Sequence, residues 1–257
     1  MRILILCQFL FVIAVFISTI RTIMSLVIFL SQQNNAESIE NGKNKFQNSE
    51  SFVRPLLWNL FYTYLFIFQH SIMATKIGKE IWIKIGFEVI QRSIYVACSS
   101  FSLSLLMANW QRLEYGSLWV FDTEQNRNVW WAITLMQFFG WMIVLGGCVM
   151  MDLGEMLGLK QVWNCYRGRA DPMTKKSKEL QSLYSHTRHP SLNGFLVIFW
   201  IHPHMTLDRC VLAILLSAYM LGFFTMDNDD YAYQYNQLIR KRGNYISPHM
   251  SHWLKLN

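Results

Sequence analysis

The sequence predicts an all-α fold: a polytopic membrane helical bundle of about six spans, the last two forming a tight helical hairpin. Two observations predict this class. The 257 residues are 53% hydrophobic and only 15% charged, whereas soluble domains carry about 25% charged residues. Several apolar stretches also reach or approach the roughly 18 to 20 residues that a membrane-spanning helix needs. An ordinary soluble domain is therefore excluded.

Residues 1–30 are predicted to form the first transmembrane span. The apolar run from Ile3 to Leu30 is longer than the core of a signal peptide, and no Ala-x-Ala-like cleavage site follows it. The segment is therefore expected to stay in the protein. Residues 31–54 are polar and rich in Asn, Gln and Ser, which predicts a disordered lumenal loop.

The other spans fall within residues 55–242, a single multi-span membrane domain. The second, third and fourth are predicted at Pro55–Ala74, Gln91–Met107 and Val129–Met151, with Ile81–Phe87 as an alternative start of the third. In the fourth span, Gly140, Gly146 and Gly147 would permit close helix contacts.

The last two apolar pieces are unequal and short. Leu192–Ile201 cannot cross a bilayer core of about 30 Å alone, and Cys210–Met226 is barely long enough. The turn between them holds the helix-stopping Pro203 and Asp208, which is predicted to be an N-cap. These features favour a hairpin over two independent spans, and residues 243–257 are predicted to follow as a cytosolic or nucleoplasmic tail.

The positions of the charges predict the orientation. With six spans, sixteen of the 23 Lys and Arg residues fall on the side of the N-terminus and six on the other side. The positive-inside rule then places both termini in the cytosol or nucleoplasm. The net charge of +7 is read as this topology signal, and direct nucleic-acid binding is not expected. The five cysteines are scattered and form no disulfide framework.

Five polar clusters lie at span ends on the cytosolic side. They are Gln69-His70-Ser71, Arg92 with Tyr95, Asp152 with Glu155 on one helix face, Tyr184 to Pro190, and Asp227 to Tyr231. Their convergence predicts a pocket at the membrane surface, although interfacial polar residues also serve as anchors. Metal binding by His186, His189 and Asp227 has no recognised ligand spacing, so no metal site is predicted.

A family resemblance is carried by the segment from Tyr184 to Gly194. Its Arg188-His189-Pro190 and Gly194 resemble the Arg-His-Pro-x-x-x-Gly signature of the isoprenylcysteine carboxyl methyltransferase-like membrane superfamily. Within that superfamily the chain is similar to the nurim family of nuclear rim proteins and to the methanethiol S-methyltransferases. The matching pieces are Phe68–Ala74, Arg92–Tyr95 and Gly194–Arg209, and the similarity covers most of residues 55–242.

The resemblance implies a pocket for S-adenosylmethionine, formed in active members by the last hairpin and the tail. Aromatic faces would steady the sulfonium, and Arg188 would pair with the cofactor carboxylate. The implied cofactor-binding residues are Tyr184, His186, Arg188, His189, Pro190, Gly194, Asp227 and Asp230, with Arg188, His189 and Asp227 as catalytic candidates. The substrate pocket is expected at Gln69, His70, Arg92 and Tyr95.

Two functions stay open on the sequence. Active methyltransferases of this superfamily carry a Glu-Glu pair after the final span, and this chain has Asp227-Asn228 there. The first hypothesis is therefore a multi-pass protein of the inner nuclear membrane without an established reaction, with the lipid bilayer and other nuclear envelope proteins as partners. The second is an active S-adenosylmethionine-dependent methyltransferase that acts on a small thiol or lipidic acceptor.

Overall fold

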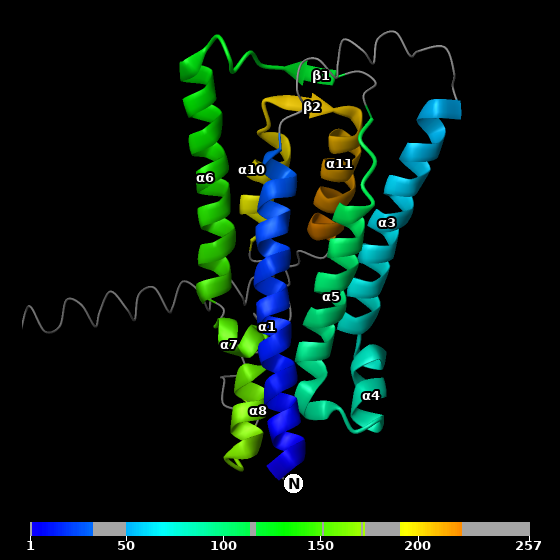
Figure 1. Cartoon of the computed structure of the whole chain (residues 1–257), viewed down its shortest axis with the longest axis vertical. Helices are drawn as coiled ribbons and strands as arrows, with labels where there is room; N and C mark the ends of the chain where they lie inside the picture. Colours follow the sequence, from blue (N-terminus) through cyan, green and yellow to red (C-terminus); the bar gives the residue numbers. More distant parts are fainter. Residues whose placement is uncertain are drawn as a thin grey trace, which may run out of the picture.

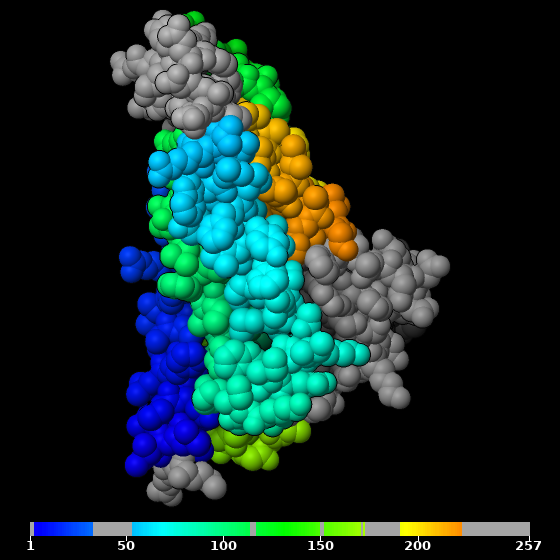
Figure 2. Space-filling model, turned by 90° about the vertical axis from the view of Figure 1, so that its right-hand side faces the viewer, coloured from blue at the N-terminus to red at the C-terminus, as the bar shows by residue number. Residues whose placement is uncertain are grey.

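Long helices run side by side along the longest axis of the molecule (Figure 1). The computed structural model describes residues 2–32, 50–113, 117–150, 152–170, 172 and 191–222. The main helices are α1 (Arg2–Ser31), α3 (Glu50–Ala74), α5 (Gln91–Ala108), α6 (Arg127–Met150), α10 (Leu192–Trp200) and α11 (Leu207–Gly222). Figure 2 shows α3 covering one face of the bundle, between α1 and α11.

Short elements lie at the two ends of the bundle. Near the N-terminus of α1 are α4 (Lys76–Lys84), the 3-10 helix η1 (Glu88–Ile90), α7 (Leu153–Met156) and α8 (Leu159–Tyr166). At the opposite end β1 (Ser117–Val120) pairs with β2 (His204–Thr206). The pairing is antiparallel and irregular between Ser117 and Trp119.

The surface of the helices is that of a membrane protein. Large apolar side chains point outward, among them Ile17 of α1 at 61% exposure and Phe139 of α6 at 62%. Within the described residues, three helical stretches have the length and composition to cross a membrane: Ile3–Ser31, Glu88–Ala108 and Arg127–Val149. The predicted all-α membrane bundle is thus confirmed, and the count of six spans stays a prediction.

The main apolar core joins α6, α10 and α11 to the C-terminal end of α1. Its members are Leu30, Val144, Leu192, Ile198, Phe199, Leu212, Ala213 and Met220. Close approach of α6 and α10 depends on glycine: a Cβ on Gly194 would lie 2.6 Å from the carbonyl oxygen of Gly140. The predicted packing role is confirmed for Gly140. At Gly146 a Cβ would meet no described atom within 4 Å, so its packing role stays a prediction.

Hydroxyl groups join α1 to α5. Thr19 lies 3.2 Å from Ser100, and Thr22 lies 3.2 Å from Ser104, between side-chain oxygens. Such short polar contacts between helices supplement packing where lipid offers no hydrophobic driving force.

Two boundaries differ from the sequence prediction. Helix α3 begins at Glu50, within the predicted loop. The alternative start of the third span near Ile81 is wrong. That stretch belongs to α4, which Thr75 caps by accepting from the Gly78 amide, and the chain then turns at Gly86 with φ of 88°.

The tip of the hairpin also differs. The sequence predicts a simple turn from His202 to Arg209, and the structure places β2 there instead. Asp208 lies in the first turn of α11, and its carboxylate accepts from Trp110 Nε1 at 2.9 Å. The tip is therefore covered by the connection between α5 and α6.

Candidate functional site

A polar cluster lies where α3, α5 and α11 meet, and we call it the His70 cluster. It comprises Gln69, His70, Ser71, Tyr95, Ser99, Ser102 and Tyr219. Helix α3 contributes three consecutive residues near its C-terminal end. Helix α5 contributes residues three and four apart, which lie on one helix face. Side chains of both helices therefore meet across the contact.

The ring of His70 lies within hydrogen-bond distance of two hydroxyls. Tyr95 Oη lies 2.8 Å from Nε2 and 3.2 Å from Nδ1, and Ser99 Oγ lies 3.1 Å from Nδ1. A neutral imidazole has one donor and one acceptor nitrogen. Which hydroxyl donates and which accepts therefore depends on the tautomer of His70.

Tyr219 brings α11 into the cluster. Ser71 Oγ donates to Tyr219 Oη at 3.1 Å, and the Tyr219 ring stands edge-on to His70 at 6.3 Å between centroids. On the other side, Ser102 Oγ donates to Gln69 Oε1 at 2.9 Å. Polar side chains from three helices are thus linked inside the bundle.

Arg92 connects the cluster to the chain after α6. Its guanidinium lies 5.3 Å from the Tyr95 ring centroid, a cation–π distance, and its Nε donates to the Met156 carbonyl at 2.9 Å. Ser93 donates to the Leu157 carbonyl at 2.8 Å. Arg92 therefore positions Tyr95 and anchors α7, although its own side chain is exposed.

Asp152 and Glu155 do not share a helix face as predicted. Asp152 caps α7, with its Oδ1 accepting from the Glu155 amide, and pairs with Lys160. The hydrogen bond from Lys160 lowers the pKa of the Asp152 carboxyl. This pair stabilises the α7–α8 turn and lies outside the His70 cluster.

The structure brings four of the predicted site residues together: Gln69, His70, Arg92 and Tyr95. Gly194 is buried against α6, where helix packing accounts for it. The remaining predicted residues, Tyr184, His186, Arg188, His189, Pro190, Asp227 and Asp230, lie outside the described residues. Among the described residues no three His, Cys, Asp or Glu side chains group as metal ligands.

Sequence reasoning missed Ser99, Ser102 and Tyr219. The two serines could have been predicted, because they follow Tyr95 at the spacing that places side chains on one helix face. Tyr219 had none, since its place beside Ser71 depends on how α11 packs against α3.

The arrangement gathers hydrogen-bonding side chains inside the bundle. Ionisable side chains within a membrane bundle are functional-site candidates. Fold and cluster together define a class of protein: an all-α membrane bundle with a polar cluster between its helices.

Comparison with known proteins places the chain more narrowly. It is 36% identical over 234 residues to a protein named Nurim homolog from Drosophila pseudoobscura pseudoobscura, covering 90% of this chain and 92% of the relative. Nurim of Bos taurus is 37% identical over 75% of this chain and 74% of its own length. Nurim of Homo sapiens is 35% identical over 74% and 73%. The chain belongs to the nurim family. No family model and no solved structure matches it.

Proposed function

We propose that this chain is a resident multi-pass protein of the inner nuclear membrane, with both termini in the cytosol or nucleoplasm. The observation that carries the proposal is the similarity to Nurim proteins along 90% of the chain, together with the nuclear rim residence that the resemblance implies. The apolar helices support membrane residence. In this proposal the bundle itself holds the protein in the nuclear envelope, with lipid and other envelope proteins as its partners.

Localisation of the tagged full-length chain tests the proposal. Immunogold labelling should concentrate on the inner nuclear membrane. Digitonin, which opens the plasma membrane and spares the nuclear envelope, should leave an N-terminal tag inaccessible to antibody until Triton is added. An even distribution through the endoplasmic reticulum would contradict the proposal.

A second function, S-adenosylmethionine-dependent methyl transfer, is favoured by the His70 cluster. The cofactor supplies the methyl group, and the expected cofactor-binding residues from Tyr184 to Gly194, with Asp227 and Asp230, rest on the family resemblance. The described residues supply the acceptor side. His70, which contacts the Tyr95 and Ser99 hydroxyls, is the candidate base for the proton of an acceptor thiol, and positioning the two reactants would supply most of the rate.

Binding of S-adenosylmethionine to the detergent-purified protein tests this second function. Calorimetry should show saturable binding that is lost in Arg188→Ala and Asp227→Ala and kept in Arg127→Ala, an exposed arginine at the start of α6. His70→Gln should keep the binding and lose methyl transfer to a small thiol. Absence of binding in a monodisperse sample would exclude the enzyme and leave the first proposal intact.

A further inference from the structure

Helix α1 carries one charge on the side that faces away from the other helices. Figure 2 shows α1 along the left edge of the molecule. On its inner side Val12 is buried against α8 and Thr22 against α5. Arg21 lies on the outer, exposed side, and it is the only charged residue between Ile3 and Ser31. This surface lies apart from the His70 cluster, and its chemistry does not depend on the proposed function.

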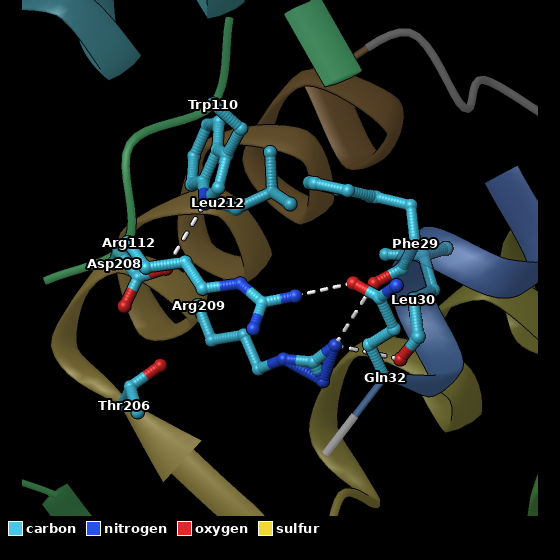
Figure 3. Close-up of a pocket in the computed structure, with 9 residues that line it drawn as sticks. All are labelled: Phe29, Leu30, Gln32, Trp110, Arg112, Thr206, Asp208, Arg209 and Leu212. Atoms are coloured by element: carbon cyan, nitrogen blue, oxygen red, sulfur yellow. Dashed lines mark hydrogen bonds between the residues drawn. The ribbon is translucent and has the colours of Figure 1, made fainter. Parts of the chain in front are cut away.

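Arg21 lies about halfway through the thickness of a membrane. The C-terminal end of α1 is polar, because Arg209 donates to the Leu30 carbonyl at 2.7 Å and Arg112 lies beside it (Figure 3). Arg21 precedes the last residue of α1 by ten residues, which is about 15 Å of helix and half of a bilayer core of about 30 Å. The side chain of a helical residue leans toward the N-terminus, and the apolar residues of α1 continue in that direction. The guanidinium therefore lies inside the apolar layer.

The charge of Arg21 is not neutralised within the described part of the chain. Arg21 has no hydrogen bond or ion pair among the described residues. A charged side chain inside a membrane is costly, and such residues almost always face the bundle interior or pair with another charge. Arg21 does neither, because it lies on the exposed side of α1. The described residues therefore leave one positive charge for a partner to neutralise.

The residues around Arg21 permit close contact with a second helix. Three small residues, Ala14, Ser18 and Ser25, are exposed and lie on the same face of α1 as Arg21. The large side chain of Ile17 lies on the other side of Arg21 and is 61% exposed. Small residues let the backbones of two membrane helices approach closely. A single helix can therefore pack along the small residues and reach Arg21 at the same time.

We propose that this face of α1 binds a transmembrane helix of another protein, one that carries a carboxylate in the middle of its span. The carboxylate accepts two parallel N–H···O bonds from the Arg21 guanidinium, and both charges are then paired within the membrane. A second copy of the chain does not fit. A symmetric contact through α1 sets Arg21 against Arg21, and the span has no acidic residue. A phospholipid does not fit either, because its phosphate lies at the membrane surface.

Energy transfer in liposomes tests the proposal with a synthetic probe and the labelled full-length protein. The probe is a single-span Leu–Ala peptide with one Asp at its centre, and the matched peptide has Asn there. The wild type should bind the Asp peptide about tenfold more tightly than the Asn peptide, or about 1.4 kcal/mol, which lies in the range of polar contacts between membrane helices. Arg21→Lys should keep this preference and Arg21→Leu should abolish it. Ser18→Leu should weaken both peptides, because it blocks close approach.

Arg127→Gln is the matched control, at an exposed arginine that lies outside α1. It should leave both affinities unchanged. Charge reversal gives an independent check: Arg21→Glu should lose the Asp peptide and bind a peptide with Lys at its centre. Equal binding of the Asp and Asn peptides by the wild type overturns the proposal, as does a preference that survives in Arg21→Leu. Energy transfer between two labelled copies that excludes the Asp peptide also overturns it and assigns the face to a dimer.

Discussion

His70 and His202 have different hydrogen-bond partners, and their chemistry differs accordingly. His70 lies within hydrogen-bond distance of two side-chain hydroxyls on α5. His202 is 4% exposed, and its Nδ1 lies 3.1 Å from the backbone amide and 2.9 Å from the carbonyl oxygen of His204. At the residue scale His70 joins two helices, and His202 holds the backbone at the tip of the hairpin.

Tyr95→Phe tests the His70 cluster. The variant removes the hydroxyl that lies 2.8 Å from His70 Nε2 and keeps the ring under Arg92. We expect a loss of about 0.6 to 1 kcal/mol, the usual worth of a hydrogen bond between membrane helices, and a melting temperature lower by about 2 to 3 °C. Tyr64→Phe, at a 63% exposed position on α3, is the control. Equal melting of the two variants in detergent would contradict the described contact.

His202 predicts a pH dependence of stability. Burial and the nearby positive charge of Arg209 lower the pKa of His202 from 6.5 to about 3. Between these values the unfolded chain binds a proton that the folded protein does not, so stability is full above about pH 6.5 and falls on acidification, by at most about 1.4 kcal/mol per pH unit. His202→Asn, which keeps an acceptor for the His204 amide, should flatten the melting profile between pH 7.5 and 5.5. An unchanged slope would assign the dependence to other groups.

At the scale of elements, the contact between α6 and α10 shows what a glycine in a membrane helix requires. A glycine permits close approach only if a second backbone faces it, and Gly194 meets this condition opposite Gly140 whereas Gly146 does not. Position along one helix cannot reveal the facing backbone. The sequence therefore identified the right helix for close packing, and the structure shows the facing backbone at Gly140.

Alanine substitutions separate these positions. In Gly194→Ala the new Cβ would lie 2.6 Å from the Gly140 carbonyl oxygen and 2.8 Å from Val144 Cγ2. The helices must then move apart, which costs about 1 to 3 kcal/mol. Gly146→Ala has open space around it among the described residues and should be neutral or stabilising, because alanine favours the helix by up to about 1 kcal/mol. Melting in detergent measures both, and a stable Gly194→Ala would refute the close contact.

For the whole molecule, the sequence predicted those helices whose apolar residues are consecutive in the chain. Helices α1, α5 and α6 match the predicted spans within a few residues, because a long apolar run is visible in the sequence itself. The pairing of β1 with β2 was not predictable: the strands have four and three residues and lie far apart in the chain. Likewise, the predicted positions of the span ends brought His70 close to Tyr95. The contact of Ser71 with Tyr219 of α11 depends on tertiary packing and was not predicted.

Membrane orientation is the prediction that depends on the whole chain at once. The segment of residues 33–49 joins the end of α1 to the start of α3, both at the end of the bundle that carries β1 and β2, while α8 lies at the end that carries the N-terminus (Figure 1). An Asn-x-Thr acceptor introduced near residue 41 should therefore be glycosylated by microsomes. One introduced between residues 173 and 180 should not, because the basic side stays in the cytosol.

The two acceptors act as controls for each other. An acceptor can stay unglycosylated simply because the transferase cannot reach it. A protease site introduced at the same two positions therefore supplies a second measurement. Protease added on the cytosolic side should cut the site between residues 173 and 180 and spare the site near residue 41. Glycosylation at both positions would mean that an even number of crossings separates the two segments, which contradicts α3, α5 and α6 as three successive crossings. The reverse pattern would keep that order and invert the bundle.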